Sequence, residues 1–472
     1  MYSDEACELL KGFMCSNGFS LYSDMWNDQP PLHTILLSTL FKLFGPALLI
    51  ARLLAVGFGG LLLFSFCSLV SSSSGRGAVI AAALFLLVSP LFVPLCFSAM
   101  LEVPALTTAL VAAWLLRAWQ GRGLKHWLGI SGLLMGCALQ TKLTAALVVP
   151  AMAAEILLAT PFHMTRDEVW SVFKNLAVWV GCACLSFFAI AIVYGGETVS
   201  LLWSSHFSLR PSDVMGDPNA LHFAFADLYN HFEGLVGVGF GVVVILLRHH
   251  WRQLAFPLAF LATVLVVHSF HRPYWYYYYL HFALPMAWIA GYGVSEGFKE
   301  LRTAFKPGLL KCPLASVWCG AMAVCVSLTL FLEGCPRLYQ EFNVLRQLPR
   351  VQDDPLLKEI VKYREATTWI YSDEYIYPFL ARIQVPPEIV VLPLKRYWSG
   401  QIDHEKVMAY VEKYQPEQVL LGTFPKISSE WETRAGTNYV KIYDDGGHRL
   451  FVLKALVAAG NRSGGRVSPT PP

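Results

Sequence analysis

The sequence predicts a mainly α-helical protein: a polytopic transmembrane helix bundle of about ten spans, followed by a small extracytoplasmic α/β domain. Three observations indicate this class. Apolar residues make up 55% of the 472-residue chain and charged residues only 15%, which is not typical of a soluble protein. Runs such as 78–97 and 313–332 carry no charge over about 20 residues, the length with which a helix crosses roughly 30 Å of hydrocarbon. After residue 334 the composition becomes that of a soluble α/β domain.

The apolar segments and the charges between them predict the topology. The predicted segments are 46–70, 78–97, 103–117, 127–159, 176–195, 233–247, 254–269, 281–295 and 313–333. Lys and Arg gather in alternate connectors, which the positive-inside rule places in the cytoplasm: Arg76; Arg117, Arg122 and Lys125; Arg166 and Lys174; Arg248 and Arg252; Lys299, Arg302, Lys306 and Lys311. The connectors 98–102, 196–232 and 270–280 have few cations and are expected to be extracytoplasmic.

Segment 127–159 must enter and leave on the cytoplasmic side if the connectors are to alternate correctly. At 33 residues it is too long for one typical span. Divided near Thr141 and Lys142, it becomes two half-length helices of about 15 residues, each rising roughly 22 Å. The turn that holds Lys142 would then lie below the outer surface, where an ammonium group is costly unless it has an anionic partner.

The first 45 residues are predicted to form an extracytoplasmic loop, although no apolar segment precedes them. Either a short tail is translocated or a first span is missing from this sequence, and we expect a missing first helix. Residues 31–44 are apolar but too few to cross the membrane, so they predict a helix that lies in its interface.

The region after the last span is predicted as an extracytoplasmic domain, 334–455, with a disordered tail, 456–472. Together with the first loop (1–45) and the bundle (46–333), these are the predicted domains. Strand-like runs at 367–373, 387–393 and 416–423 alternate with helical stretches such as 403–414. The segment 439–454 predicts a hairpin with Asp-Asp-Gly-Gly as its turn.

Several acids lie in the first loop, beside an otherwise apolar sequence. These are Asp4, Glu5, Asp24 and Asp28, and a fifth acid, Glu102, lies in the next short outer loop. Any one of them can be a solvated loop residue. Because the topology brings all five toward Lys142, we favour a polar pocket in which a carboxylate acts as general base and the cation holds an anion.

These residues stand in segments that resemble a known family. "SDEACELLKGF", then "GFSLYSDMWNDQPPL", "FG" and "ARLLAV" resemble the first outer loop of the C-type glycosyltransferases, in particular bacterial relatives of protein O-mannosyltransferases and of lipid A aminoarabinose transferase. "GLLMGCALQTKLTAALVVPA" (132–151) resembles that family's "G-L-A-x-x-T-K" segment. The C-terminal region, 381–423, resembles the outer domain of many bacterial members, so the resemblance extends from residue 3 to about 454.

The resemblance implies a bundle of about eleven to thirteen transmembrane helices with an active site at the outer face. It implies transfer of a sugar from a polyprenyl-phosphate carrier to an acceptor, generally with inversion. Asp4, in the Asp-Glu motif, would then be the base that takes the acceptor's proton, and Glu5 a structural or orienting partner. A bacterial inner membrane is the expected location, with membrane lipids as surroundings.

The leaving group of such a reaction is a lipid phosphate, so cations are needed where its charge grows. By resemblance Lys142 is the first candidate. Other outer-side candidates are His206, Arg210, His271 and Arg272. Two cationic side chains suffice to neutralise a lipid monophosphate, so no cofactor is required. A divalent metal is possible, because some relatives use one, but nothing in the sequence indicates it.

One position departs from the family pattern. The residue before Pro-Pro-Leu is often Lys or His in the family, whereas here it is Gln29, which cannot supply positive charge. Asp24 matches the family's "Y-x-D" aspartate, and Asp28 has no firm counterpart. The phosphate must then be held by Lys142 and the arginines, or the donor is bound differently.

Competing interpretations remain open. A transporter or flippase of lipid-linked sugars would also place polar residues at membrane depth, but would favour inverted repeats, and none is visible. A non-catalytic membrane scaffold is the other alternative. The sequence does not indicate a nucleic-acid partner, since the net charge is only +3 and no basic stretch alternates with aromatics. The run 273–281 is either an interfacial aromatic belt or a platform for a sugar or isoprenoid. The sugar and the acceptor are not identified by the sequence.

Overall fold

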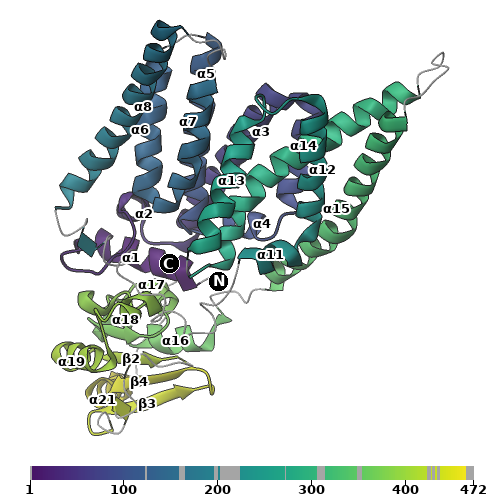
Figure 1. Ribbon diagram of the computed structural model, residues 1–472. Helices are drawn as coiled ribbons and strands as arrows, with labels where there is room; N and C mark the ends of the chain where they lie inside the picture. The colour runs from purple at the N-terminus through teal and green to yellow at the C-terminus, as the bar shows by residue number, and fades with distance from the viewer. Residues whose placement is uncertain are drawn as a thin grey trace. The chain divides into compact units, whose positions relative to one another are not determined.

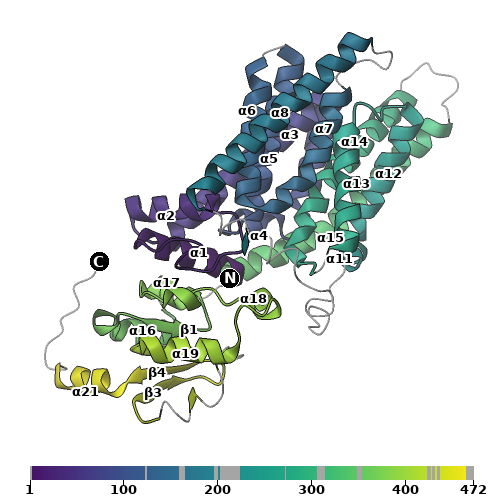
Figure 2. The same ribbon diagram turned by 60° about the vertical axis from the view of Figure 1, so that its left-hand side comes forward.

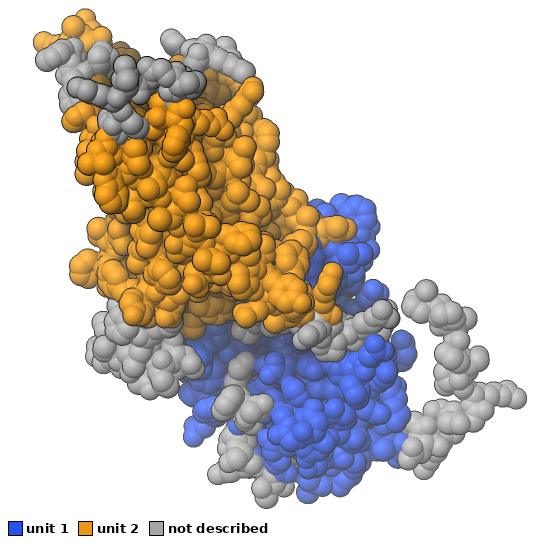
Figure 3. All heavy atoms as spheres, turned by 90° about the vertical axis from the view of Figure 1, so that its right-hand side faces the viewer, with its two compact units in different colours: residues 1–52, 194–213, 348–472 blue, residues 53–193, 214–347 orange. Residues whose placement is uncertain are grey.

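The computed structural model describes residues 3–122, 125–158, 165–195, 200–201, 224–271, 273–305, 314–347, 353–422, 427, 431–432 and 436–463. The chain divides into two compact units (Figure 3). Unit 1 comprises residues 1–52, 194–213 and 348–472, and unit 2 comprises residues 53–193 and 214–347. The first loop therefore belongs to the same unit as the C-terminal domain. His206, Arg210 and Arg272 lie outside the described residues.

Unit 2 is a helical bundle (Figure 1). Its helices are most of α3 (Leu48–Leu87), then α4 (Phe92–Cys96), α5 (Glu102–Arg122), α6 (Lys125–Thr141), the 3-10 helix η1 (Leu143–Val148), α7 (Val149–Leu158), α8 (Arg166–Val193), α11 (Ala224–Asn230), α12 (Phe232–Arg248), α13 (Ala255–Phe270), the 3-10 helix η3 (Tyr276–Tyr278), α14 (Tyr279–Ala304) and α15 (Leu314–Gln347). Contacts between α5, α6 and α8, and between α12, α14 and α15, build two neighbouring layers (Figure 2).

Glycines allow the helices of the bundle to approach closely. A Cβ at Gly241 of α12 would lie 2.3 Å from the backbone oxygen of Ile289 in α14, and a Cβ at Gly136 of α6 would lie 2.3 Å from that of Ala183 in α8. Small residues at such crossings are typical of membrane helices, because van der Waals packing replaces the hydrophobic effect inside a bilayer.

Three helices are long and apolar enough to cross a membrane by length and composition: α3, α8 and the Leu314–Val344 part of α15. A fourth is reached if α11 and α12, which meet at a bend of 89°, count together. This criterion admits fewer helices than the roughly ten predicted spans, because it requires both length and uniform hydropathy: α13 has only 16 residues, and the longer α5 and α14 are not apolar enough. The mainly helical class with a small C-terminal sheet is confirmed.

The predicted segment 127–159 is divided as expected: α6 ends at Thr141 and a new helical stretch begins after Lys142. For the predicted segments 46–70 and 78–97 the structure differs from the prediction. One helix, α3, runs from Leu48 to Leu87 with a turn at Gly75, whose φ is 80° and ψ 173°.

The helix after Gly75 stops ten residues before residue 97, because Pro90 interrupts it. Proline cannot donate the helical hydrogen bond, and the chain turns through Leu91 at φ 63° before the short helix α4. The exposed backbone of this break is satisfied by α15. Glu341 accepts a hydrogen bond from the Leu91 amide at 3.2 Å, and Arg337 donates to the Val88 carbonyl at 3.4 Å.

This contact explains why α15 passes the predicted boundary between residues 333 and 334. Its polar final turns continue to Gln347, since they bind the broken chain at 88–91 instead of entering the C-terminal domain.

Unit 1 contains α1 (Ser3–Ser16), α2 (Leu32–Phe44) and a four-stranded sheet in the order β1-β2-β4-β3. The strands are β1 (Ile370–Ser372), β2 (Gln418–Leu421), β3 (Tyr439–Asp444) and β4 (Arg449–Leu453). Only β1 and β2 are parallel. The other elements are α16 (Pro355–Lys362), η5 (Arg364–Ala366), α17 (Ile376–Ala381), η6 (Pro387–Ile389), α18 (Leu394–Trp398), α19 (His404–Tyr414) and α21 (Lys454–Ser463).

The hairpin predicted at 439–454 is confirmed, but two other predictions for this unit are wrong. Residues 387–393 form η6 and a buried extended stretch, not a strand. Prolines at 386, 387 and 393 remove backbone donors, and the Leu392 amide donates to the Tyr375 hydroxyl at 2.9 Å. Residues 456–463, predicted as disordered, continue α21, which packs on β4; residues 464–472 lie outside the described residues.

Helix α2 forms where a helix is expected at 31–44, and its location in the membrane interface stays a prediction. One face is buried, with Leu37 and Phe41 directed toward α1 and α17, and the Phe41 ring packs at a tilt against Phe379 with ring centroids 5.5 Å apart. On the other side Leu43 and Phe44 are more than two-thirds exposed. An apolar exposed face is what a helix lying in a membrane interface requires.

Candidate active site

Lys142 stands at the junction of two helical elements in unit 2. Helix α6 ends at Thr141, and Lys142 is extended (φ −156°, ψ 133°) before η1 turns the chain into α7. The break leaves Lys142 buried, with 6% of its surface exposed. A buried ammonium requires an anion close to it, and the structure supplies one.

That anion is Glu102, the first residue of α5. Its carboxylate, only 1% exposed, forms an ion pair with the Lys142 ammonium. Both residues belong to the same unit, and α5 packs on α6. Glu102 is therefore the anionic partner that the sequence predicts for Lys142.

Two tyrosines complete the surroundings of Lys142. The ammonium lies 4.8 Å from the ring centroid of Tyr277 and 5.3 Å from that of Tyr278, both at η3. Ring faces attract a cation, especially where it is desolvated. Both tyrosines are buried, so within the run 273–281 these two rings pack around Lys142 and do not form a lipid-facing belt.

A histidine pair follows the same aromatic cluster. His268 of α13 and His281 of α14 are joined by a hydrogen bond of 3.0 Å between Nε2 and Nδ1, and both are buried. His271, a predicted phosphate ligand, caps the C-terminus of α13. Its ring centroid lies 6.3 Å from that of Tyr278. His271 is therefore next to the aromatic wall of the Lys142 cluster.

A second charged cluster lies in unit 1, where α1 meets the loop 22–31. Lys11 is 1% exposed, and its ammonium donates to Glu8 at 2.6 Å and to the Asn27 side chain at 2.9 Å. Burial alone would lower the pKa of Lys11, but the neighbouring Glu8 carboxylate outweighs it, so the pKa of Lys11 is raised. This ammonium anchors the loop to α1.

Asp28 and Gln29, at the end of that loop, are held together with a lysine from α18. The Asp28 carboxylate accepts from Gln29 Nε2 at 3.0 Å and from Lys395 Nζ at 3.1 Å. Tyr22 donates to the Gln29 carbonyl at 2.6 Å. Gln29 carries no charge, but the structure places a cation one side chain away from it.

The neighbour of Lys395 supports the same loop. The Arg396 guanidinium lies 5.6 Å from the Trp26 ring centroid and donates to the Glu388 and Val391 carbonyls. Trp26 also donates to the Gln401 side chain. Burial lowers the pKa of Arg396 to about 10, so it remains charged at neutral pH.

The remaining predicted carboxylates are on or near α1. Asp4 lies in its first turn with an exposed side chain. Glu5 is buried and accepts two hydrogen bonds from Arg52, at 3.2 and 3.3 Å, which is the geometry of a structural ion pair. Asp24 is exposed and accepts from the Ser20 amide at 2.7 Å, so it closes the turn at 20–25.

The predicted site residues thus fall into two groups. Asp4, Glu5, Asp24, Asp28 and Gln29 belong to unit 1, and Glu102, Lys142 and His271 belong to unit 2. Each group is defined within its own unit. That the first-loop acids converge on Lys142 stays a prediction.

Part of this chain matches a protein family, and the whole chain resembles solved structures. The family model described as dolichyl-phosphate-mannose-protein mannosyltransferase matches residues 28–194, which include Asp28, Glu102 and Lys142. Comparison with curated protein sequences gives no match. The structure of ArnT from Cupriavidus metallidurans bound to undecaprenyl phosphate is similar, with a TM-score of 0.62 and 14% identity over 96% of this chain and 94% of ArnT. The fold is that of a C-type glycosyltransferase.

Two further structures share this glycosyltransferase fold. ArnT from the same organism in the apo state gives a TM-score of 0.59 at 14% identity, over 99% of this chain and 94% of ArnT. The apo oligosaccharyltransferase of Archaeoglobus fulgidus gives 0.53 at 14% identity, over 92% of this chain and 66% of that protein. The protein is thus a multi-pass membrane protein of this fold.

Several residues of the charged cluster in unit 1 are not predicted by the sequence analysis. Lys11 and Glu8 are three residues apart on α1, a spacing at which helical side chains meet, and this signal was available. Lys395 and Arg396 gave no such signal. They lie more than 360 residues from Asp28, and only the tertiary structure brings them to the loop.

Within the described residues, no group of three or more His, Cys, Asp or Glu side chains is arranged to hold a metal ion. The chemistry available in the described clusters is that of carboxylates, three lysines, an arginine, histidines and aromatic hydroxyl groups. The expectation that no metal is required stays a prediction.

Proposed function

We propose that this chain is a membrane glycosyltransferase that moves a sugar from a polyprenyl-phosphate carrier to an acceptor at the outer face of a bacterial inner membrane, with inversion at the anomeric carbon. The observation that carries the proposal is the likeness to ArnT over nearly the whole of both chains, in a structure that holds undecaprenyl phosphate. The charged clusters described above supply the groups that such chemistry needs.

Asp4 is the general base in this proposal. Its carboxylate is exposed, so it is accessible to an acceptor hydroxyl, unlike the buried Glu5. Asp4 takes the hydroxyl proton while the acceptor oxygen bonds to the anomeric carbon. The bond from that carbon to the phosphate oxygen breaks, and its electron pair leaves with the polyprenyl phosphate. Positioned general-base catalysis of this kind contributes about 10² to 10⁴ in rate.

Lys142 stabilises the departing phosphate. A buried ammonium near aromatic rings interacts strongly with an anion, because water does not screen it. Glu102 keeps Lys142 in place and balances its charge while the site is empty. The hydroxyl groups of Tyr277 and Tyr278 are further donors in the same cluster. Lys142 is therefore the cation of unit 2 that we assign to the phosphate.

Lys395, in the same unit as Gln29, supplies the positive charge that Gln29 lacks. It is partly exposed, and among the described residues it pairs with Asp28, which also accepts a hydrogen bond from the Gln29 side-chain amide. A lysine paired at the edge of a loop can redirect one N–H to a phosphate oxygen at little cost. Position 29 then keeps the loop conformation through Gln29, and the charge comes from α18.

The test is release of free polyprenyl phosphate from sugar-loaded carriers by the purified protein, across a panel of sugars. Wild type should release it with at least one sugar, and Asp4→Asn should lower turnover by about 10² to 10⁴ while still binding the carrier. Glu405→Gln, an exposed acid on α19, is the matched control and should leave turnover unchanged.

The competing functions predict other results. A transporter would move the labelled carrier across proteoliposomes without cleaving it, and Asp4→Asn would not alter that movement. A scaffold would bind carriers or proteins and show no release with any sugar. Either result, obtained with folded protein, would reject the enzyme.

A further inference from the structure

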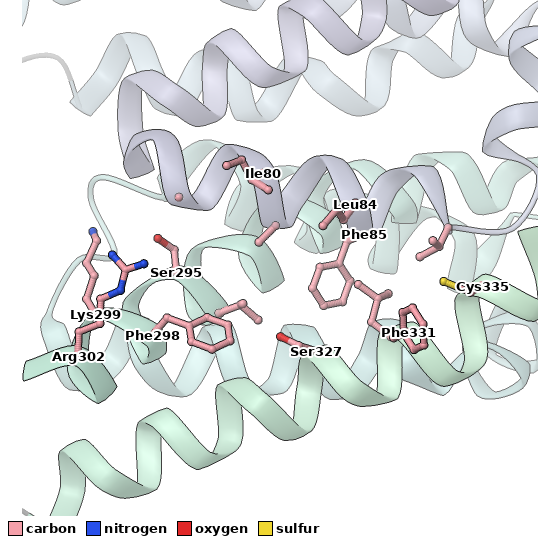
Figure 4. A pocket seen from close by; sticks show the side chains of 15 residues that line it. Ile80, Leu84, Phe85, Ser295, Phe298, Lys299, Arg302, Ser327, Phe331 and Cys335 are labelled. Atoms are coloured by element: carbon pink, nitrogen blue, oxygen red, sulfur yellow. The ribbon is translucent and has the colours of Figure 1, made fainter. Parts of the chain in front are cut away.

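A groove crosses the surface of the bundle between α3, α14 and α15, far along the chain from the candidate catalytic residues. Its volume is about 610 Å³, within the range of cavities that bind small molecules. The walls are apolar over most of their length, with Ile80 and Leu84 on one side and Phe298 and Phe331 on the others (Figure 4). All three helices belong to unit 2.

One end of the groove is cationic. Lys299 and Arg302, one turn apart on α14, lie at this end, and Ser295 lies beside them (Figure 4). Lys299 pairs with Glu296 at 2.5 Å, whereas Arg302 makes no ion pair or hydrogen bond within the described part of the chain. The hydroxyl of Ser295 likewise has no hydrogen-bond partner there. The end thus has donors available to an anion.

The cationic end belongs to the leaflet opposite the Lys142 cluster. Helix α14 begins at Tyr279, directly after Tyr277 and Tyr278, which surround Lys142. Twenty residues separate Tyr279 from Lys299, a rise of about 30 Å, which is the thickness of the hydrocarbon core. The positive-inside rule places this end at the cytoplasmic face. A donor phosphate at Lys142 therefore cannot also contact Arg302.

The length of the groove matches one leaflet. Along α3 it extends from Gly77 to Val88, about 16 Å, which is half of the roughly 30 Å core. Gly77 brings α3 close to α14 at the cationic end, where a Cβ would lie 2.7 Å from the Ser295 hydroxyl. A single acyl chain that enters from the cytoplasmic surface would fill this length.

We propose that this groove binds an anionic glycerophospholipid of the inner leaflet, with its phosphate at Arg302 and Lys299 and one acyl chain along Ile80, Leu84 and Phe331. The cytoplasmic leaflet is rich in anionic lipids, and basic sites between transmembrane helices on that side suit their head groups. This lipid is a resident ligand, distinct from the sugar donor. The proposal does not rest on the glycosyltransferase activity.

The experiment measures lipid retention by native mass spectrometry. Delipidated full-length protein is mixed with equal amounts of phosphatidylglycerol, phosphatidylethanolamine and phosphatidylcholine. Wild type should retain phosphatidylglycerol selectively. Each interfacial cation near an anionic lipid contributes about a fivefold preference, so Arg302→Gln should lower the selectivity about fivefold and Lys299→Gln with Arg302→Gln up to about 30-fold.

Two matched controls separate this groove from general surface effects. Arg166→Gln with Lys174→Gln removes the same charge from α8 at the same membrane face and should retain wild-type selectivity. Leu84→Trp fills the groove and should reduce retention of every lipid, whereas Ile192→Trp on the exposed surface of α8 should not.

Four results would overturn the proposal. The first is that wild type retains phosphatidylcholine as well as it retains phosphatidylglycerol. The second is that the α8 charge variant loses as much selectivity as the groove variant. The third is that equimolar undecaprenyl phosphate displaces phosphatidylglycerol, which would assign the groove to the donor. The fourth is that Leu84→Trp converts a dimer into a monomer, which would assign the groove to a second copy of the chain.

Discussion

Two ion pairs, Lys142–Glu102 in unit 2 and Lys395–Asp28 in unit 1, use the same chemical groups in different surroundings. The side chains of the first pair are 8% and 1% exposed, and those of the second 19% and 16%. The first pair is enclosed by apolar helices and aromatic rings, whereas the second lies at the edge of a loop. The difference teaches that breaking the buried pair weakens the fold as well as the proposed phosphate contact of Lys142, whereas the edge pair can exchange partners with a ligand at little cost to the fold.

The largest effect is expected from breaking the buried pair. Glu102→Ala leaves the Lys142 ammonium uncompensated in a low-dielectric environment and should destabilise the protein by about 3–5 kcal/mol. Chemical unfolding of purified protein in detergent measures this. The double variant Glu102→Gln with Lys142→Met should recover part of the loss, because no buried charge remains.

The surface pair Lys413–Glu388 is the control for that comparison. Its lysine is more than half exposed, so Glu388→Gln should change stability by no more than about 1 kcal/mol. Equal effects from Glu102→Ala and Glu388→Gln would show that Lys142 is solvated and that the contrast between the two regions is wrong.

A smaller loss of stability is expected from Lys11→Met. The substitution keeps the volume of the buried side chain but leaves Glu8 and Asn27 without their donor, at a cost of about 2–3 kcal/mol. The pKa of Lys11 is raised, so its contribution is fully present below its unfolded value and is lost only as pH rises through the still higher folded value.

The difference between wild type and Lys11→Met should therefore stay constant from pH 6 to pH 10. Unfolding midpoints at several pH values in this window measure it. A difference that shrinks toward pH 10 would mean that Lys11 loses its proton there, and that the anchor of the loop is weaker than the buried contacts indicate.

Lys395→Gln should separate stability from activity. Because the pair is near the surface, stability should fall by less than about 1 kcal/mol. Turnover of the donor should nevertheless fall about tenfold, the effect of losing about 1.4 kcal/mol of interaction with the phosphate in the transition state. Lys413→Gln is the control and should leave turnover unchanged. Unchanged turnover in Lys395→Gln as well would remove Lys395 from the proposed phosphate site.

The smallest effect concerns the hairpin turn, far from either pair. Amides of His448 and Gly447 donate to Asp445, and these bonds lower the pKa of Asp445 to about 2. Their stabilisation is present above about pH 3.8 and is lost as the pH falls through 2. Titration of ¹³C-labelled aspartate by NMR should find this value. A value near 3.8 would show that the turn is not formed as described.

The sequence alone predicts the parts of this molecule that depend on local pattern. Lys142 is predicted to need an anion because its position follows from the length of one apolar segment and the charges around it. The hairpin follows from its turn residues. Gly75 and Pro90 were visible in the sequence too, but the uniform hydrophobicity of residues 78–97 concealed the break that Pro90 causes.

Contacts between distant segments were not predictable. Asp28 and Gln29 were recognised as unusual from the sequence, yet nothing in it indicates that α18 would supply Lys395. In the same way, residues 387–393 have the composition of a strand. The prolines remove backbone donors, and the Leu392 amide donates to the Tyr375 hydroxyl and not to a neighbouring strand. Pairing partners are set by tertiary structure, which one sequence does not record.

The break at Pro90 has a consequence for the biogenesis of the protein. The Leu91 amide, which the break leaves without a helical partner, donates a hydrogen bond to Glu341, 250 residues later in the chain. At a synthesis rate of about 5–20 residues per second, roughly 12 to 50 s pass before that partner leaves the ribosome. During this interval the Leu91 amide lacks its partner from α15, and the turn at 88–91 is without a contact that stabilises it in the complete chain. We expect nascent chains arrested before α15 to be the forms most readily recognised by membrane quality-control proteases, and pulse-chase analysis of chains truncated on either side of α15 measures this.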